Sequence, residues 1–302
     1  MINLTEPLAP EEFRSRLYDG EMFCLRKRPT VQAIIEATQK HAEACLAPLH
    51  PTKAHESLSR AELIETFGQY RRSYQKNTEI QSLWRAFFTS LGFDPDNTAC
   101  DRTLARVQTP FERSEMDNSD LVTAPLAFHR DTWGSNLYAQ INWWAPVYPI
   151  TQDRTMQMYP QLWDRPLDNT SAEFDLPTVI QNQRKRGRCQ STPDEHIPRL
   201  SEDISDLVAV PVVIDPGDVF VFSGAHAHGS VRNTSDLTRL SLETRTVDIN
   251  DLQSGRGAPN LDGHAKWMAP GWFRRMSDGT AMNELLGVDV VTQAKLPKFA
   301  KN

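Results

Sequence analysis

Residues 216–245, PGDVFVFSGAHAHGSVRNTSDLTRLSLETR, are the stretch that decides the fold. A Pro-Gly-Asp turn opens an apolar run, which we expect to be a strand that ends in two histidines, His226 and His228. The run RLSLETR at residues 239–245 then carries polar residues at odd positions and mostly apolar residues at even positions. This period of two predicts a strand with one face toward a polar cavity and the other face against helices.

The same period extends through the second half of the chain. From about Thr103 onward, short β-branched or aromatic runs are separated by Pro, Gly, Asn and Asp. They read TLARVQT, LYAQINWWAPV, LVAVPVVI, DVFVFSG and RLSLETRTV. From Thr30 to about Leu91, apolar residues instead recur at three- and four-residue spacing, which predicts helices with one buried face. The sequence therefore predicts an α+β protein, with a mainly β core that follows helices.

Nothing in the composition marks a linker, so we expect residues 1–302 to form a single domain. Its helical part covers about 1–102 and its β core about 103–248, and a C-terminal extension follows at 249–302.

An insertion at about 164–206 interrupts the core and contains the basic cluster RKRGR, residues 184–188. Charge clusters usually face water, so a solvated surface excursion is one interpretation. Long loops in compact domains are often functional, so a lid over a binding site is the other. If the insertion is a lid, the basic cluster favours an anionic substrate.

The net charge of -6 argues against a nucleic-acid partner and favours a small molecule. The 4 cysteines are scattered and form no C-x-x-C pair, which suits a reduced cytoplasm. The chain begins without a basic, apolar leader and has no apolar run of roughly 18 residues, so we expect a cytoplasmic protein without a membrane partner. The sequence leaves the oligomeric state open.

The stretch FHRDTW, residues 128–133, carries a histidine and a carboxylate two positions apart. On an extended strand His129 and Asp131 would present a nitrogen and an oxygen to one point in space. An H-x-D pair is common by chance, so the chain must supply a third ligand. His228 completes a 2-His-1-carboxylate set, which is expected for non-haem Fe(II) oxygenases. Arg239, on the next strand, has the planar fork that pairs with a carboxylate.

These residues resemble the Fe(II)- and 2-oxoglutarate-dependent dioxygenases over roughly residues 103–248. The layout H-G-S-x-x-N-x-S-x-x-x-R, from His228 to Arg239, resembles the phytanoyl-CoA dioxygenase branch in particular. The resemblance implies a double-stranded β-helix, a jelly-roll, cupin-like core packed by the N-terminal helices. The P-G-S-H segment of many members is replaced here by MYPQLW, residues 158–163, so no substrate is carried over.

The resemblance also implies a role for each matching residue. His129, Asp131 and His228 would bind Fe(II), Arg239 would bind the distal carboxylate of 2-oxoglutarate, and Ser241 would assist the same carboxylate. Molecular oxygen (O2) would be the second cosubstrate. The carboxylate at position 131 favours hydroxylation over halogenation, because related halogenases carry a small residue there.

Further pocket residues follow from strand parity. Tyr138, Gln140, Asn142 and Trp144 share one side of a strand. We expect Gln140 and Asn142 near the cosubstrate, although hydrogen bonds to neighbouring loops would also satisfy a buried amide. Tyr138, Trp144 and Trp133 are candidates for substrate contact, with core packing as the alternative.

His226 shares its strand parity with His228 and is the alternative ligand. The H-G-S continuation and the spacing to Arg239 favour His228, which leaves His226 at the rim or as a hydrogen-bonding partner of the site.

The sequence thus predicts an oxygenase that hydroxylates an unactivated C–H bond of a small-molecule metabolite, in specialised biosynthesis. Desaturation or cyclisation are alternative outcomes, since they depend on how the substrate is positioned. A non-catalytic, cupin-like binding protein is the alternative from another class. The pattern Arg239-x-Ser241 argues against a cupin-type metalloenzyme that works without 2-oxoglutarate.

Overall fold

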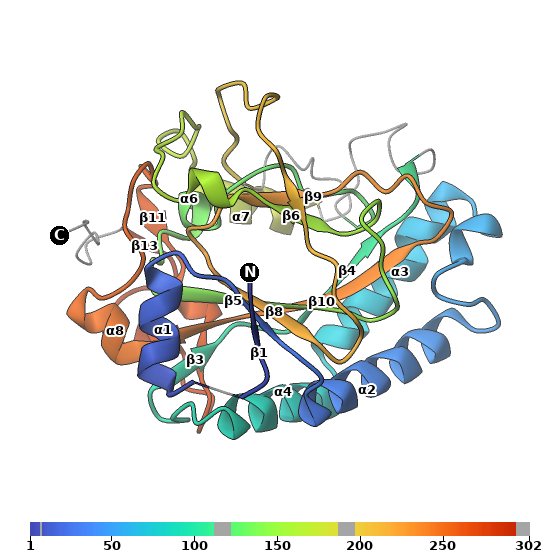
Figure 1. The fold of residues 1–302 in the computed structure, drawn as a ribbon, viewed down its shortest axis with the longest axis horizontal. Coiled ribbons are helices and arrows are strands. Elements are labelled where there is room, and N and C mark those ends of the chain that lie inside the picture. The colour runs from blue at the N-terminus through green and yellow to red at the C-terminus, as the bar shows by residue number, and fades with distance from the viewer. Residues whose placement is uncertain (7, 112–121, 187–196, 294–302) are drawn as a thin grey trace.

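Two β-sheets face each other across the middle of the molecule, and helices cover the outer side of the larger sheet (Figure 1). The structure, a computed structural model, describes residues 1–6, 8–111, 122–186 and 197–293. Mixed helices and sheets confirm the expected α+β class. In the described ranges, no helix combines the length and the apolar character that a membrane crossing requires.

The larger sheet has 8 strands and is antiparallel except for its first pair. Its order is β1 (Ile2–Leu4), β2 (Phe23–Leu25), β8 (Val219–Ser223), β5 (Gln140–Pro146), β10 (Arg239–Asp248), β3 (Thr98–Cys100) and β12 (Arg274–Arg275), with β4 (Leu104–Gln108) also paired to β10. β10 is the longest strand and pairs with three others, so the sheet is organised around it.

The smaller sheet has 3 strands in the order β7 (Val210–Pro211), β6 (Met156–Met158) and β9 (His228–Ser230). An apolar cluster joins it to the larger sheet. Met156 and Met158 of β6 pack with Trp144, Phe220 and Phe222 there. A separate pair, β11 (Trp267–Met268) and β13 (Thr292–Gln293), lies in the C-terminal extension.

The helix layer consists of α1 (Pro10–Tyr18), α2 (Pro29–Leu46), α3 (Arg60–Gln75) and α4 (Thr78–Ser90). The first residues of these four helices explain where each helix begins. Pro is at the first turn of α1 and α2, Ser59 and Glu62 form a capping box at α3, and Asn77 caps α4. The remaining helices are short, apart from α7: η1 (Ala54–Glu56), α6 (Thr132–Ser135), η2 (Pro160–Leu162), α7 (Leu176–Arg186), α8 (Ile249–Ser254), η5 (Pro270–Trp272) and α9 (Met282–Leu285).

The alternation in β10 behaves as the sequence predicts. Leu240 and Leu242 are buried in the core beneath the helices, while Arg239 and Glu243 line a pocket between the sheets. Strand β10 therefore has an apolar outer face and a polar inner face.

Two details differ from the sequence expectations. The main sheet takes strands from outside residues 103–248, namely β1, β2, β3 and β12. Of the expected strand LVAVPVVI, only Val210–Pro211 forms a strand, and one further hydrogen bond, from the Val212 N–H to the carbonyl of Met156 at 2.9 Å, follows it. Val208 is left 78% exposed. The side chains of the basic cluster at 184–188 lie outside the described residues.

Trp143 on β5 links the sheet to the helix layer. Its ring stacks on Phe13 of α1 at 5.7 Å and meets Phe88 of α4 at 5.0 Å between centroids. Its indole N–H donates to the Thr246 hydroxyl at 2.9 Å, so its polar atom is satisfied within the core.

We predict that Trp143→Ala lowers the free energy of unfolding by about 3–5 kcal/mol, since the site cannot collapse around the missing ring. Urea denaturation measures the change. Trp143→Phe keeps most of the packing and loses the hydrogen bond to Thr246, so its loss should be clearly smaller. A loss below about 1 kcal/mol for Trp143→Ala would contradict this account of the core.

Candidate metal centre and its pocket

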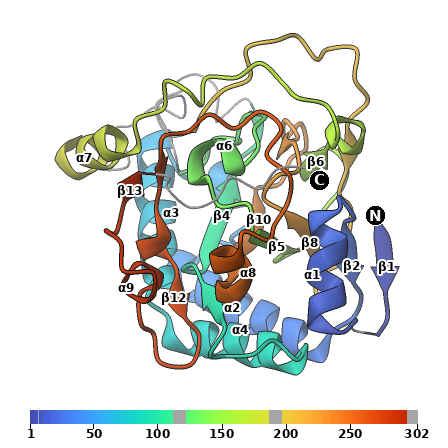
Figure 2. The ribbon, with the colours of Figure 1, turned by 90° about the vertical axis from the view of Figure 1, so that its left-hand side faces the viewer.

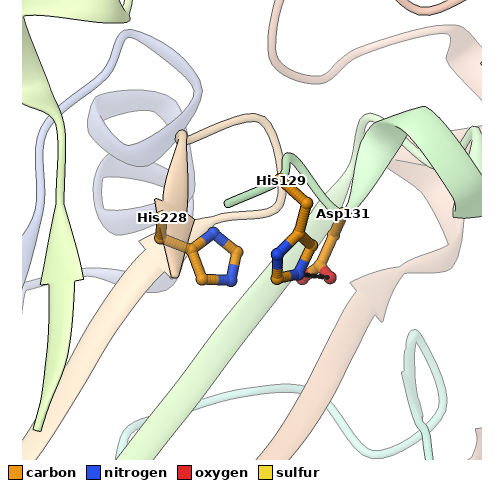
Figure 3. Close-up of side chains that lie close together, drawn as sticks. All are labelled: His129, Asp131 and His228. Atoms are coloured by element: carbon orange, nitrogen blue, oxygen red, sulfur yellow. Dashed lines mark ion pairs between the residues drawn. The ribbon is translucent and has the colours of Figure 1, made fainter. Parts of the chain in front are cut away.

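A main-chain bridge brings the two distant halves of the site together. The backbone N–H of His129 donates to the carbonyl of His228 at 2.9 Å, and the N–H of His228 donates back at 3.0 Å. Their rings lie 4.3 Å apart between centroids (Figure 3). Because the bridge is made by backbone atoms, the fold itself sets the position of both imidazoles.

Asp131 lies at the N-terminus of α6 and places its carboxylate beside the two imidazoles. Its backbone is helical, with φ -60° and ψ -35°, and it caps α6, so the expected extended H-x-D strand is wrong. The turn still places the Asp131 Oδ1 atom 3.4 Å from the Nε2 atom of His129. The expected strand ending in two histidines is also wrong, because β8 ends at Ser223 and His228 begins β9.

The three side chains are arranged as metal ligands. One ligand atom from each of His129, Asp131 and His228 lies within 4.8 Å of the others. The Nδ1 atoms of the histidines face the carbonyls of Ala127 at 2.8 Å and His226 at 3.0 Å. A carbonyl only accepts hydrogen bonds, so Nδ1 carries the proton and the Nε2 lone pair is open to a cation.

Protonation states agree with this geometry. Burial lowers the pKa of His228 to about 4, with a smaller effect of the same sign from His129. Burial alone would raise the pKa of the Asp131 carboxyl, but Arg245 and then His129 outweigh it and hold that pKa well below its usual range. A neutral imidazole and an ionised carboxylate are the forms that bind metal.

Two amides fix the orientation of the carboxylate. Gln140 Nε2 donates to Asp131 Oδ2 at 3.1 Å, and Asn142 Nδ2 donates to the same oxygen at 2.5 Å. The other carboxylate oxygen of Asp131, Oδ1, therefore points toward His129. The structure thus gives Gln140 and Asn142 a partner other than the expected cosubstrate, and a direct cosubstrate contact stays a prediction.

Arg239 lies in the same pocket with most of its donors open. It is 6% exposed, and its Nη2 atom is 3.4 Å from the Ser230 hydroxyl. Among the described residues, its Nε and Nη1 atoms and the Ser241 hydroxyl have no partner. Burial lowers the pKa of Arg239 to about 10, helped by Arg106, so the side chain is charged at neutral pH. A buried cation with open donors is a site for an anion.

Three charged pocket residues were not foreseen as site residues. Arg106 Nη2 is 2.6 Å from Glu243 Oε1, and Arg245 Nη1 is 3.4 Å from Asp101 Oδ2. The parity of β10 did place Glu243 and Arg245 on the cavity face. Arg106 lies on β4 opposite Ser241, a register that only the folded chain reveals.

The structure places only one of the three candidate substrate-contact residues in the lining of the pocket. Trp144 lines the pocket, beside Leu126, Met156 and Phe222. Trp133 is fully buried, and its indole N–H donates to Asp262 Oδ1 at 2.8 Å. Tyr138 is buried outside the pocket lining. Only Trp144 of the three is therefore placed to touch a molecule in this pocket.

His226 lies apart from the cluster of ligand atoms. Its Nε2 atom is 3.0 Å from the carbonyl of Gly20 and its Nδ1 atom 3.2 Å from that of Ser223. Its ring packs against Trp163 with centroids 4.3 Å apart and planes tilted by 36°. Both nitrogens are thus turned to the backbone, and the structure brings His228 rather than His226 to the carboxylate.

Comparison with known proteins gives one family and several similar structures. The family model "Phytanoyl-CoA dioxygenase (PhyH)" matches residues 53–241. A comparison with curated proteins finds no match. The non-haem α-ketoglutarate-dependent carbocyclase SnoK from nogalamycin biosynthesis is 16% identical, with 81% of this chain and 87% of that chain covered and a TM-score of 0.43. EvdO2 from Micromonospora carbonacea var. aurantiaca is 13% identical, with 82% and 94% covered and a TM-score of 0.44.

We predict that His228→Ala weakens Fe(II) binding by more than about 100-fold, because losing even an outer partner of a ligand costs about 10–100-fold. Titration calorimetry without oxygen measures the affinity. His226→Ala is the matched control and should bind Fe(II) as the unaltered protein does. Loss of binding in His226→Ala with retention in His228→Ala would show that the wrong histidine has been assigned.

Proposed function

The chain belongs to the phytanoyl-CoA dioxygenase family of Fe(II)- and 2-oxoglutarate-dependent enzymes, and from that premise we propose that it hydroxylates a C–H bond of a small-molecule metabolite. The observation that supports this most is the shared pocket of the three ligand-like side chains and the open guanidinium of Arg239. One end of this pocket suits a divalent cation and the other a carboxylate.

The residues present fit the family's metal. Two open Nε2 lone pairs from His129 and His228 and one ionised oxygen from Asp131 form the donor set of non-haem iron sites. Bound Fe(II) would supply the oxygen chemistry, in which 2-oxoglutarate and O2 yield succinate, carbon dioxide and one oxygen atom for the substrate. The protein's own part is to hold both reactants and exclude water.

The residues also fit 2-oxoglutarate. Arg239 offers two nitrogens and Ser241 a hydroxyl that have no partner within the described ranges, all buried on the inner face of β10. We assign both residues to the distal carboxylate of 2-oxoglutarate, where a bidentate pair would satisfy these donors. Arg106 Nε is a further buried donor without a partner among the described residues and adds to the positive end of the pocket.

The finer structural assignments belong to the same proposal. The two facing sheets form a double-stranded β-helix within one domain, whose helical part, core and extension follow the expected divisions. For the insertion at 164–206, a surface excursion and a lid both stay predictions, and we place the protein in the cytoplasm.

The pocket indicates the kind of substrate only broadly. Its apolar side, formed by Leu126, Trp144, Met156 and Phe222, suits a molecule that buries a hydrocarbon part. Hydroxylation is the proposed outcome, with desaturation or cyclisation set by how the substrate lies against this wall. A role in specialised biosynthesis remains a prediction.

We predict that the Fe(II)-loaded protein forms succinate from 2-oxoglutarate under air, and faster with a suitable metabolite. Succinate is measured across a broad metabolite panel, with oxygenated products followed by mass spectrometry. Asp131→Ala should lose this turnover while it stays folded, because it removes an anionic ligand and little packing. Tight binding of Fe(II) and 2-oxoglutarate without any succinate would instead identify a non-catalytic binding protein.

We predict that Arg239→Ala weakens 2-oxoglutarate binding by at least about 30-fold, since it removes one partner of a buried charge pair. Calorimetry on the Ni(II)-loaded protein without oxygen measures the affinity. Fe(II) binding should be unchanged, and Arg72→Ala, on the exposed side of α3, is the matched control. Unchanged 2-oxoglutarate affinity in Arg239→Ala would remove this residue from the site.

A further inference from the structure

A second cavity lies on the outer side of the main sheet, away from the metal centre. It is enclosed by α4, by β3 and the residues after it, and by the segment around β12, which lie toward the lower end of the molecule in Figure 2. Its volume is about 480 Å³, within the range of small-molecule sites, whereas the pocket at the metal centre measures about 50 Å³. Thr244 of β10 lines both, so the two spaces adjoin at this strand.

One wall of this cavity is apolar and aromatic. Trp84 and Phe88 are buried neighbours on one face of α4, with rings 5.7 Å apart between centroids. Trp272 is half-buried and lines the cavity from the C-terminal extension, as does Met276. Trp84 and Phe88 are only 2% and 0% exposed, so they form the backing of this wall, and Trp272 is the aromatic side chain that offers an accessible face to a planar ring.

The rim of the cavity is cationic. Arg85, Arg102 and Arg274 all line it. In the part of the chain that the structure describes, none of the three has a carboxylate within 4.0 Å, whereas Arg275 is paired with Asp278 at 2.5 Å. Three guanidinium groups gathered around one cavity repel each other, so an anion placed there is stabilised.

The other polar groups of the lining neutralise this charge only in part, since Asp101 interacts electrostatically with Arg102 and no second carboxylate of the described residues lines the cavity. Asp101 is the one carboxylate among the described lining residues, and it is turned toward Arg245 at 3.4 Å and the backbone N–H of Arg102 at 2.7 Å. The Thr103 hydroxyl is buried in the same lining and has no hydrogen-bond partner among the described residues. Arg274 Nη1 donates to the carbonyl of Gly279 at 3.1 Å, so the cavity combines a positive rim with one open neutral hydroxyl.

We propose that this cavity is a second binding site, for a small organic anion with a planar apolar body and a carboxylate or phosphate group. The ring packs against Trp272, and the anionic group pairs with Arg102 and Arg274. The site is separate from the metal centre and does not depend on the function proposed above.

Titration calorimetry tests the proposal with two probes, 1-naphthoate and 1-naphthyl phosphate, which share the ring and differ in the anion. Saturable binding of at least one of them at one site per chain is expected, and the stronger of the two identifies the natural anionic group. 1-Naphthol lacks the charge and inorganic phosphate lacks the ring. Each should bind at least about tenfold more weakly, because each loses half of the contacts.

Variants locate the binding. The double variant Arg102→Ala with Arg274→Ala should weaken the preferred probe by at least about tenfold, and both residues are exposed enough for the fold to tolerate the change. Arg72→Ala with Lys76→Ala removes the same charge elsewhere and should have no effect. Arg239→Ala should also have no effect, since it alters only the pocket at the metal centre.

Two results would overturn the proposal. One is that neither naphthyl anion binds saturably. The other is binding that survives the double variant or is lost in Arg239→Ala, which would place the probe elsewhere on the protein. Thermal unfolding of each variant shows that it is folded when it is measured.

Discussion

The structure depends on the pair of backbone hydrogen bonds between His129 and His228. This bridge joins the segment after the first core strands to the start of β9, and with it the two sides of the pocket. Because peptide groups make it, the imidazoles are aligned before any cation binds, and their Nδ1 hydrogen bonds fix which nitrogen faces inward. A site preorganised in this way loses little entropy when it takes up a metal.

Most of the buried charged side chains on the inner face of β10 lie next to a side chain of opposite charge. Glu243 pairs with Arg106 at 2.6 Å, and Arg245 lies 3.9 Å from Asp131, so these charges have opposite neighbours. Arg239, at the start of the strand, has no such neighbour within 4.0 Å among the described residues. Burying an unpaired guanidinium raises the free energy of the folded protein, and a bound dicarboxylate would offset that increase. The unpaired end of this face is thus where the cosubstrate is placed.

The sequence alone predicted the helices, most of the strands and that His228 lies close to Asp131, because periodicity and residue type are local signals. It missed the helical backbone of Asp131, since the turn into α6 is set by tertiary contacts. It did not foresee the hydrogen bond from Gln140 to the Asp131 carboxylate, and the expected contact of Gln140 with the cosubstrate stays a prediction. The sequence did not indicate Arg106 as a site residue, because the register between two strands cannot be read from the alternation of polar and apolar residues alone.

The most direct test of the central claim is a crystal structure with Mn(II) in place of iron and 2-oxoglutarate, with the metal located by anomalous scattering. The account predicts one metal peak at about 2.0–2.3 Å from His129 Nε2, Asp131 Oδ1 and His228 Nε2. It also predicts the far carboxylate of 2-oxoglutarate against Arg239. A metal held by His226, or a cosubstrate bound away from Arg239, would contradict it.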